Sequence, residues 1–577
     1  MQCGYIVLML FSVMNMMFMH YYIFYNHYME DILLAYDYVN NFLMIIFDVV
    51  VILLVFVFFL WGRVKQSLLL TFIITWMWSF LNIFYARFFN QYIPLSVLGQ
   101  ISQLTDQAVY NSIISGFQWI DLYYPISFLL FLIFYRFLGT LMLTRRLLHS
   151  LLIVPVVTFL GVFIVYSLYH FSKSIRGNIV LYKKTMAGLF YLGARNAYPN
   201  STRFTAGCVR VAIGECYDMF TEMKLTELQQ RAISLEVADL SLRVTNHHQA
   251  PPIKNVIMVI LESFLSAPID LKVDGKEITP FLNVLKQRDD TYYNGHMIPN
   301  ITMGESGDGQ FIYMTGILPL RDKLVVGEAK SLRLPALPHL LASKKKIKDS
   351  EIIIPSPPRV WEQEKMNIVY GIHKMYCNRD ILGPSVKYLN DEQIFSMAMK
   401  SVKGKRNPFF SIILNYSTHQ PYKFPVDDSF KLKEEKLPEA YRNYLVACHY
   451  TDRCLNKYID FLKQEGVYDN SLIIIMADHH AHLDAIKMDS CLTKELPLFI
   501  IHGNIDKSKA WKNTMNQLDV YTTILDILDI HNDWHGLGHT ILNSNYRNSL
   551  TDKAWTMSEW IIKGKYFGIL NTSKEDN

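Results

Sequence analysis

The chain has 577 residues, of which 51% are hydrophobic and 14% aromatic, and its formal net charge is +5. This length exceeds a single hydrophobic core, because cores stop growing beyond about 250–300 residues. The small positive charge forms no basic tract, which predicts that nucleic acid is not a partner.

Five apolar runs occupy the first 170 residues, and each approaches the roughly 20 residues that cross a bilayer. They cover residues 5–25, 42–61, 68–88, 126–143 and 151–169. The first run lacks the basic start and small-residue cleavage site of a signal peptide. We therefore predict a transmembrane domain of five helices over residues 1–170.

Basic residues in the connections predict how these helices are oriented. Arg63 and Lys65 follow the second run, and Arg145 and Arg146 follow the fourth. The positive-inside rule places such connections in the cytoplasm. With five spans, everything after the fifth is then extracytoplasmic.

Two charged residues fall inside predicted spans, where an unpaired charge is expensive. Asp48 lies in the second span and Arg136 in the fourth. We predict that Asp48 forms an ion pair with Arg136, or with Arg87 at the end of the third span.

Residues 171–250 combine basic, apolar and small residues with helical spacing, which predicts a juxtamembrane helical linker. Pro251 and Pro252 end it, because consecutive prolines resist helix and sheet interiors. From residue 251 to 577, strand-like and helix-like segments alternate, which predicts an α/β domain with a central, mostly parallel sheet covered by helices. The expected strands are 255–261, 352–354, 409–414, 472–476 and 498–501, and the expected helices are 279–287, 310–318, 439–465 and 520–528.

Two of these strands end in residues suited to a metal. Glu262 follows the strand at 255–261, and Asp478 and His479 follow the strand at 472–476. A carboxylate buried there is costly unless it is paired or bound to a metal, so an ion pair is the alternative. Oxygen ligands with one imidazole suit manganese, magnesium or zinc. His480 and His482 could support the metal ligands, contact a substrate, or belong to a surface loop.

Ser306 lies between glycines ahead of the helix expected at 310–318. Helix N-termini bind anions, and a metal can activate a serine toward a phosphate or sulfate ester. A simple helix cap is the alternative for Ser306. His419 follows the strand at 409–414 and could reach a phosphoryl oxygen, or serve as a turn residue ahead of Pro421.

Five motifs together resemble the lipoteichoic acid synthase and phosphoglycerol transferase family of the alkaline phosphatase/sulfatase superfamily. They are LESF at 261–264, ITP at 278–280, GESGDGQF at 304–311, NYSTHQPY at 415–422 and ADHH at 477–480. The five spans that precede an outward domain belong to the same resemblance. The resemblance implies one divalent metal, most often Mn²⁺ with Mg²⁺ or Zn²⁺ as alternatives, held by Glu262, Ser306, Asp478 and His479.

The resemblance also implies roles for residues around the metal. Ser306 stands where the family has a threonine nucleophile, and His419 matches a histidine that contacts the substrate head group. Trp361 matches a tryptophan that is followed two residues later by a phosphoglycerol-binding arginine. Here that second position is Gln363, and Arg359 lies two residues before the tryptophan.

The function implied is a membrane-anchored, metal-dependent transferase of a bacterial cytoplasmic membrane, with residues 251–577 as its extracytoplasmic catalytic domain. It would move phosphoglycerol from a phospholipid donor to an envelope glycan or lipid acceptor through a covalent Ser306 intermediate. A type I sulfatase is excluded, because the segment SGDGQ at 306–310 lacks the Pro and Arg of the formylglycine motif. The alternatives are a phosphoethanolamine transferase of the same superfamily and a catalytically inactive membrane sensor or scaffold.

Overall fold

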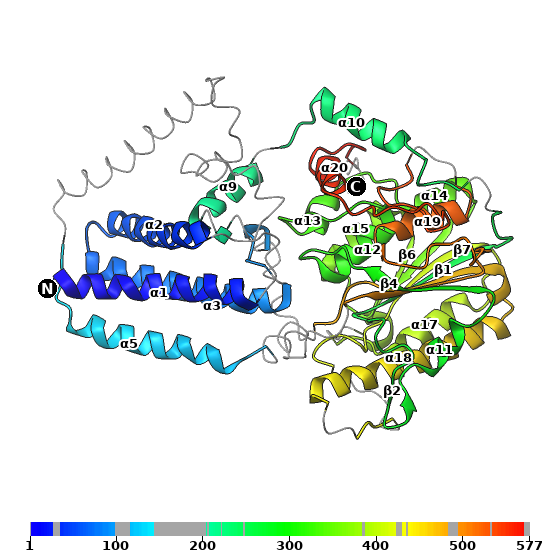
Figure 1. Ribbon diagram of the computed structural model, residues 1–577, viewed down its shortest axis with the longest axis horizontal. Coiled ribbons are helices and arrows are strands. Elements are labelled where there is room, and N and C mark those ends of the chain that lie inside the picture. The colour runs from blue at the N-terminus through cyan, green and yellow to red at the C-terminus, as the bar shows by residue number, and fades with distance from the viewer. Residues whose placement is uncertain are drawn as a thin grey trace. The chain divides into compact units, whose positions relative to one another are not determined.

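The computed structural model describes residues 2–26, 35–89, 91–97, 116–142, 203–204, 207–220, 222–245, 249–383, 387–422, 430–433, 437–482, 494–530 and 534–569. The elements divide into two compact units, with α1 to α9 in the first and α10 to α20 in the second (Figure 1). The domain boundaries expected from the sequence stay a prediction.

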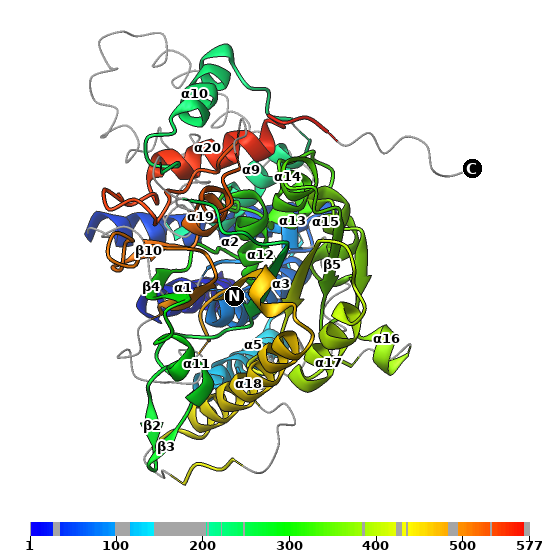
Figure 2. The ribbon, with the colours of Figure 1, turned by 90° about the vertical axis from the view of Figure 1, so that its right-hand side faces the viewer.

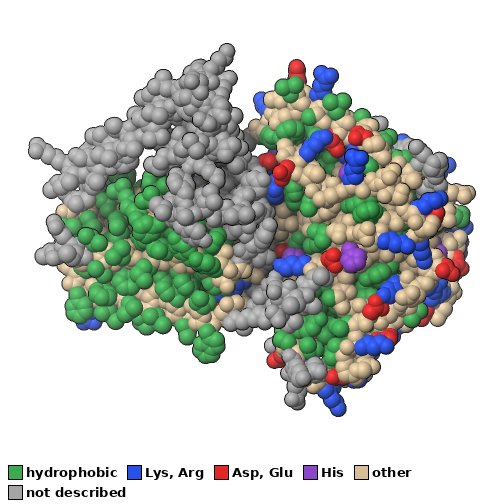
Figure 3. All heavy atoms as spheres, in the orientation of Figure 1, with side chains coloured by type: hydrophobic (Ala, Val, Ile, Leu, Met, Phe, Trp, Pro, Cys, Tyr) green, Lys and Arg blue, Asp and Glu red, His purple; other side chains and the backbone are tan. Residues whose placement is uncertain are grey.

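Among the described residues of the first unit, four helical segments are long and apolar enough to cross a membrane. They are formed by α1 (Gln2–Asn26), α2 (Ala35–Phe59), α3 (Val64–Phe89), and the 3₁₀ turn η2 (Trp119–Leu122) continuing into α5 (Tyr123–Phe137). Where Figure 3 colours this unit, hydrophobic side chains predominate, whereas charged side chains are spread over the second unit. The chain is therefore a multi-pass membrane protein.

The spans differ in detail from the prediction. The fourth covers Trp119–Phe137 rather than 126–143. It ends early because Leu138 adopts an extended backbone, with φ −84° and ψ 134°. The fifth predicted run, residues 151–169, lies outside the described residues.

The charged groups of the first unit are paired differently from the prediction. Arg87 makes a two-pronged ion pair with Asp121, with Nη–Oδ distances of 2.7 and 2.8 Å, and both side chains are buried. Asp48 instead accepts backbone N–H groups of Cys208 (2.6 Å) and Val209 (3.3 Å), at the start of α9 (Cys208–Phe220). The predicted pairing of Asp48 with Arg136 or Arg87 is wrong, because the unpaired N–H groups of a helix start satisfy the carboxylate.

Gly207 allows this close approach of α2 and α9. Its φ is +84°, and a Cβ built on it would lie 2.9 Å from Asp48 Oδ1. A side chain here would therefore suffer both backbone strain and a clash with the capping carboxylate.

We expect Asp48→Ala to destabilise the first unit by about 0.5–2 kcal/mol, the usual cost of removing a helix cap. Asp48→Asn should lose less, because its amide oxygen still accepts a hydrogen bond. Thermal unfolding of the full chain in detergent measures both. Arg136→Ala is the control and should change little, since Arg136 is exposed; an equal loss in that variant would restore the ion-pair interpretation.

The second unit is built on an eight-stranded sheet in the order β10-β4-β9-β8-β1-β7-β5-β6. Its strands are β1 (Asn255–Leu261), β4 (Thr291–Ile298), β5 (Asp349–Ile353), β6 (Lys374–Tyr376), β7 (Phe409–Leu414), β8 (Ser471–Ala477), β9 (Leu496–Ile501) and β10 (Met515–Asn516). Strand β9 runs antiparallel to β4 and β8, and the other neighbours are parallel. The expected mostly parallel sheet is confirmed. A separate hairpin joins β2 (Lys272–Val273) to β3 (Lys276–Glu277).

Helices cover both faces of this sheet, as its apolar central strands require. One layer contains α11 (Pro280–Leu285), α17 (Asp391–Val402) and α18 (Glu439–Gln464) (Figures 1 and 2). The other contains α12 (Glu305–Thr315), α13 (Val325–Ala329), α14 (Leu337–Lys344), α15 (Gln363–Tyr370), α19 (Asp519–Ile527) and α20 (Asp552–Lys563). Helix α10 (Glu227–Ala238) packs against α20, and the short elements are η5 (Val360–Glu362), α16 (Arg379–Leu382) and η6 (Tyr468–Asn470).

Candidate functional site

The site begins where two neighbouring parallel strands end. Strands β1 and β8 are paired with Leu261 opposite Ala477. The next residues, Glu262 and Asp478, therefore leave the sheet side by side at the same edge. Asp478 Oδ1 accepts the backbone N–H groups of Ser263 (2.9 Å) and His479 (2.7 Å), which fixes its carboxylate.

Helix α12 brings Ser306 to these carboxylates. The helix begins at Glu305, not at 310 as predicted, so Ser306 lies inside its first turn. Ser306 Oγ donates a hydrogen bond to Glu262 Oε2 at 3.0 Å, and it lies 3.2 Å from His479 Nε2. The nucleophile position and the strand ends, far apart in sequence, thus meet.

His479 completes the group. Its Nε2 lies 3.1 Å from Glu262 Oε1 and 3.6 Å from Asp478 Oδ2. A tetrahedral metal with bonds of about 2.0–2.1 Å separates its ligand atoms by about 3.3 Å, and these distances bracket that value. The buried Glu262, Asp478 and His479 could hold a metal ion, and their donor atoms suit a divalent cation without specifying which one.

The electrostatics of the group favour positive charge among these side chains. Burial would raise the pKa of Glu262, but the adjacent His479 outweighs it and the pKa is lowered. Burial and the Glu262 carboxylate raise the pKa of Asp478 to about 8. Burial would lower the pKa of His479, yet the Asp478 and Glu262 carboxylates raise it well above its usual range. A divalent cation would supply the positive charge that these carboxylates favour.

Two glycines let α12 approach the site closely. A Cβ on Gly309 would lie 2.5 Å from the carbonyl oxygen of Asp478, so the helix packs directly against the end of β8. A Cβ on Gly307 would lie 3.3 Å from the ring of Trp361, whose indole therefore covers the first turn of α12. The Gly-Asp-Gly segment is thus a packing requirement of the site.

His419 lies close to the cluster. Its ring stacks on Tyr416, with centroids 4.7 Å apart, and its Nδ1 lies 2.5 Å from the carbonyl oxygen of Gln420. Burial lowers the pKa of His419 although the nearby Glu262 raises it. A neutral imidazole held in this way could contact a substrate oxygen.

The other residues predicted to bind substrate are not drawn into the metal-ligand cluster. Gln363 is buried, and its amide donates to Asn367 Oδ1 at 2.8 Å within its own helix. Arg359 is exposed. Among the described residues, it makes no hydrogen bond or ion pair with the site. His480 is partly buried, with its ring 5.6 Å from that of His482. Substrate-binding roles for these residues and for Trp361 stay predictions.

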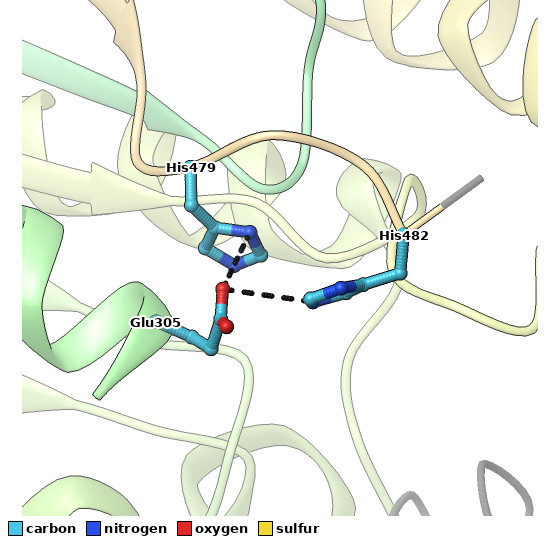
Figure 4. Close-up of side chains that lie close together, drawn as sticks. All are labelled: Glu305, His479 and His482. Atoms are coloured by element: carbon cyan, nitrogen blue, oxygen red, sulfur yellow. Dashed lines mark ion pairs between the residues drawn. The ribbon is translucent and has the colours of Figure 1, made fainter. Parts of the chain in front are cut away.

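Sequence reasoning named His482 beside the site but missed Glu305, which pairs with it. Glu305 Oε2 lies 3.3 Å from His479 Nδ1 and 3.5 Å from His482 Nε2 (Figure 4). The available signal for Glu305 was proximity in sequence, since it directly precedes Ser306. Asn415 was quoted only within a motif, and its Oδ1 accepts the backbone N–H of Glu262.

Comparison with known proteins assigns this domain. The sulfatase family matches residues 254–530, the span that carries Glu262, Ser306, Asp478 and His479. Residues 254–530 belong to the sulfatase family. The family lies in the alkaline phosphatase superfamily, so the resemblance read from the motifs is confirmed.

Lipoteichoic acid synthases are among the similar proteins. Lipoteichoic acid synthase 2 of Bacillus subtilis (strain 168) is 28% identical over 313 residues, which are 51% of this chain and 48% of that protein. Lipoteichoic acid synthase of Staphylococcus aureus (strain USA300) is 25% identical over 464 residues, 75% of this chain and 66% of that protein. The matched regions therefore cover less than two thirds of each relative's length.

A solved membrane protein shares the fold over nearly the whole chain. It is lipooligosaccharide phosphoethanolamine transferase A from Neisseria meningitidis, with a TM-score of 0.54, 16% identity, and coverage of 95% of this chain and 99% of that one. At this identity the similarity shows the fold alone.

We expect Gly309→Ala to disturb the site, because its Cβ would meet the Asp478 carbonyl at 2.5 Å. Overpacking of this kind costs about 1–3 kcal/mol and would displace the end of β8. Thermal unfolding and metal content of the full chain measure the effect. Gly327→Ala in α13 is the matched control, because its Cβ would meet nothing within 4 Å; equal behaviour of the two variants would contradict the packing argument.

Proposed function

We propose that this chain is a membrane-bound, metal-dependent transferase that moves phosphoglycerol from a phospholipid to an envelope glycan or lipid acceptor. The observation that carries the proposal is the placement of the Ser306 hydroxyl 3.0 Å from Glu262 and 3.2 Å from His479, beside Asp478. A hydroxyl on a helix start, against carboxylates and an imidazole, suits covalent phosphoryl-type transfer. Similarity to lipoteichoic acid synthases over 75% of the chain supports phosphoglycerol as the group.

Glu262, Ser306, Asp478 and His479 would hold one divalent cation, Mn²⁺ first and Mg²⁺ or Zn²⁺ as alternatives, which would lower the pKa of the Ser306 hydroxyl and screen charge on the phosphate. Glu262 Oε2 accepts the Ser306 hydrogen bond and so orients Oγ. The first intrahelical bond of α12 runs from Gly307 N to Gly304 O. The N–H groups of Glu305 and Ser306 precede it and could hold the non-bridging phosphate oxygens.

The proposed reaction has two displacements. In the first, Ser306 Oγ forms a bond to phosphorus, the bond from phosphorus to the diacylglycerol oxygen breaks, and that oxygen takes up the proton lost by the serine. In the second, an acceptor hydroxyl attacks the same phosphorus, Ser306 leaves, and the proton returns to Oγ. The membrane spans would hold the domain near its lipid donor and so raise the donor's effective concentration.

The positive residues between the spans, together with the fifth run predicted at 151–169, support an extracytoplasmic position for this domain, with the spans in a bacterial cytoplasmic membrane. A donor lipid in the outer leaflet and an envelope acceptor are both accessible from that side. Arg63 lies between α2 and α3, and Lys65 lies in the first turn of α3, at the end of the spans where the orientation argument needs them.

A phosphoethanolamine transferase is the second candidate, because a protein of that name shares the fold over 95% of the chain. An ammonium head group needs a free carboxylate or an aromatic face. Glu362, which could serve, already pairs with Lys330 (3.3 Å) and Lys365 (2.9 Å). These pairs weaken Glu362 as an ammonium site, whereas Glu364, the other carboxylate that flanks Gln363, is exposed and keeps the second candidate open. An inactive sensor or scaffold would not need four reactive side chains in contact.

Donor lipid and nucleophile are tested together. We expect the full chain in vesicles to release diacylglycerol from labelled phosphatidylglycerol, and Ser306→Ala to lower the rate by several orders of magnitude while remaining folded. Phosphatidylethanolamine is the parallel substrate. Release from the ethanolamine lipid alone would overturn the donor, and a Ser306→Ala rate within about tenfold of wild type would overturn the covalent intermediate.

The metal is tested by composition. The purified full chain should contain about one divalent ion, and Glu262→Ala or Asp478→Ala should abolish it, because each removes an anionic ligand. Glu364→Ala on the exposed side of α15 is the control and should keep the ion. Elemental analysis of the purified variants gives the answer. Full occupancy without either carboxylate would contradict the site.

A further inference from the structure

Glu305 occupies a backbone position that does not suit it. Its φ is +43°, in the left-handed region that residues other than glycine rarely adopt. Its side chain is also buried, with the residue only 6% exposed, so the carboxylate is largely withdrawn from water. Strain and burial both lower the stability of the fold, and they persist only where other contacts of the residue compensate for them.

The compensating contacts are those of the Glu305 carboxylate. Glu305 Oε2 points between His479 Nδ1, at 3.3 Å, and His482 Nε2, at 3.5 Å (Figure 4). The opposite nitrogen of His479, Nε2, faces Glu262 and Ser306 at 3.1 and 3.2 Å. The imidazole of His479 is therefore held between the proposed metal ligands on one side and Glu305 on the other.

A further contact decides which nitrogen of His479 can bind a cation. Its Nδ1 lies 2.9 Å from the carbonyl oxygen of His480. A carbonyl oxygen only accepts, so Nδ1 keeps its proton, and Nε2, which faces the Glu262 carboxylate at 3.1 Å, is the nitrogen that can give up a proton and bind a cation. Glu305 places a negative charge beside this N–H, which strengthens it as a donor and raises the basicity of Nε2.

We propose that Glu305 is a positioning residue for the cation site: steadied by His482, it holds His479 in the tautomer and orientation in which Nε2 binds metal. The inference rests on the proposed function only in that Nε2 is a metal ligand. Glu305 lies in the motif at 304–311, but the family resemblance assigned it no role.

A second cation between Glu305, His479 and His482 is the rival, since their ligand atoms all lie within 4.8 Å of one another. His479 would then have to bind it through Nδ1. That nitrogen already donates to the His480 carbonyl and cannot ligate without losing its proton. The rival site keeps only two protein ligands, so the contacts favour positioning.

Two substitutions separate the role of the carboxylate from that of the backbone. Glu305→Gly should relieve the positive φ, so the thermal midpoint should stay equal or rise, while Mn²⁺ affinity falls about 10- to 100-fold, as expected for an outer partner of a metal-bound histidine. Glu305→Gln should also weaken Mn²⁺, with the strain unchanged. His482→Ala should weaken Mn²⁺ less, because it acts through Glu305.

Titration calorimetry of Mn²⁺ into the metal-stripped full chain in detergent measures affinity and stoichiometry together. Glu351→Gln is the control. Glu351 is a fully buried carboxylate on β5 that contacts Lys405 and Ser411 at 2.9 and 3.1 Å, so its loss should lower stability and leave Mn²⁺ affinity unchanged.

Wild-type stoichiometry of one with weakened Mn²⁺ binding in Glu305→Gly supports the proposal. Unchanged affinity in that variant overturns it, and so does a wild-type stoichiometry of two that falls to one, which would establish the second cation site. These readouts need no donor lipid. Weakened Mn²⁺ binding without diacylglycerol release would therefore sink the proposed function alone, and a wild type that binds none of Mn²⁺, Mg²⁺ and Zn²⁺ would sink both.

Discussion

Backbone hydrogen bonds between β1 and β8 set Leu261 opposite Ala477, and the whole candidate site depends on that register. A shift of one residue would turn alternate side chains to the other face of the sheet and separate Glu262 from Asp478. Both strands are fully buried, which makes any slip expensive. The register thus places two carboxylates within reach of one cation before any loop is considered.

Several residues around the site adopt strained backbone conformations. Left-handed φ values occur at Ser263 (+52°) and Glu305 (+43°), each next to a proposed ligand, and at Trp361 (+52°), whose ring covers Gly307. Strain of about 1–3 kcal/mol per residue persists only where surrounding contacts determine the backbone. Here the buried sheet and the close packing of α12 through Gly309 provide that constraint. The same rigidity preorganises Ser306 against Glu262 and His479.

The first unit satisfies its buried charges by two different routes. Arg87 and Asp121 neutralise each other through a two-pronged ion pair, whereas Asp48 accepts N–H groups at the start of α9. Both arrangements answer the same requirement, since an uncompensated charge within a span is expensive. Charge counting in the sequence predicted an ion pair for Arg87 but chose the wrong acid, and it could not find the second route, because a helix start carries no formal charge.

The sequence by itself determined the elements whose burial is uniform. The apolar runs of β1 and β7 gave their bounds, 255–261 and 409–414, because a strand covered on both faces is apolar throughout. It also indicated Glu262, Asp478, His479 and Ser306 from their positions beside such elements. Only the tertiary structure decided several other features. They are the polar strand β4, the short strands β6 and β10, the start of α12, and the partners of Asp48 and His479. These features have little periodicity of their own, and each depends on residues distant in sequence that only the folded sheet and helices bring into contact.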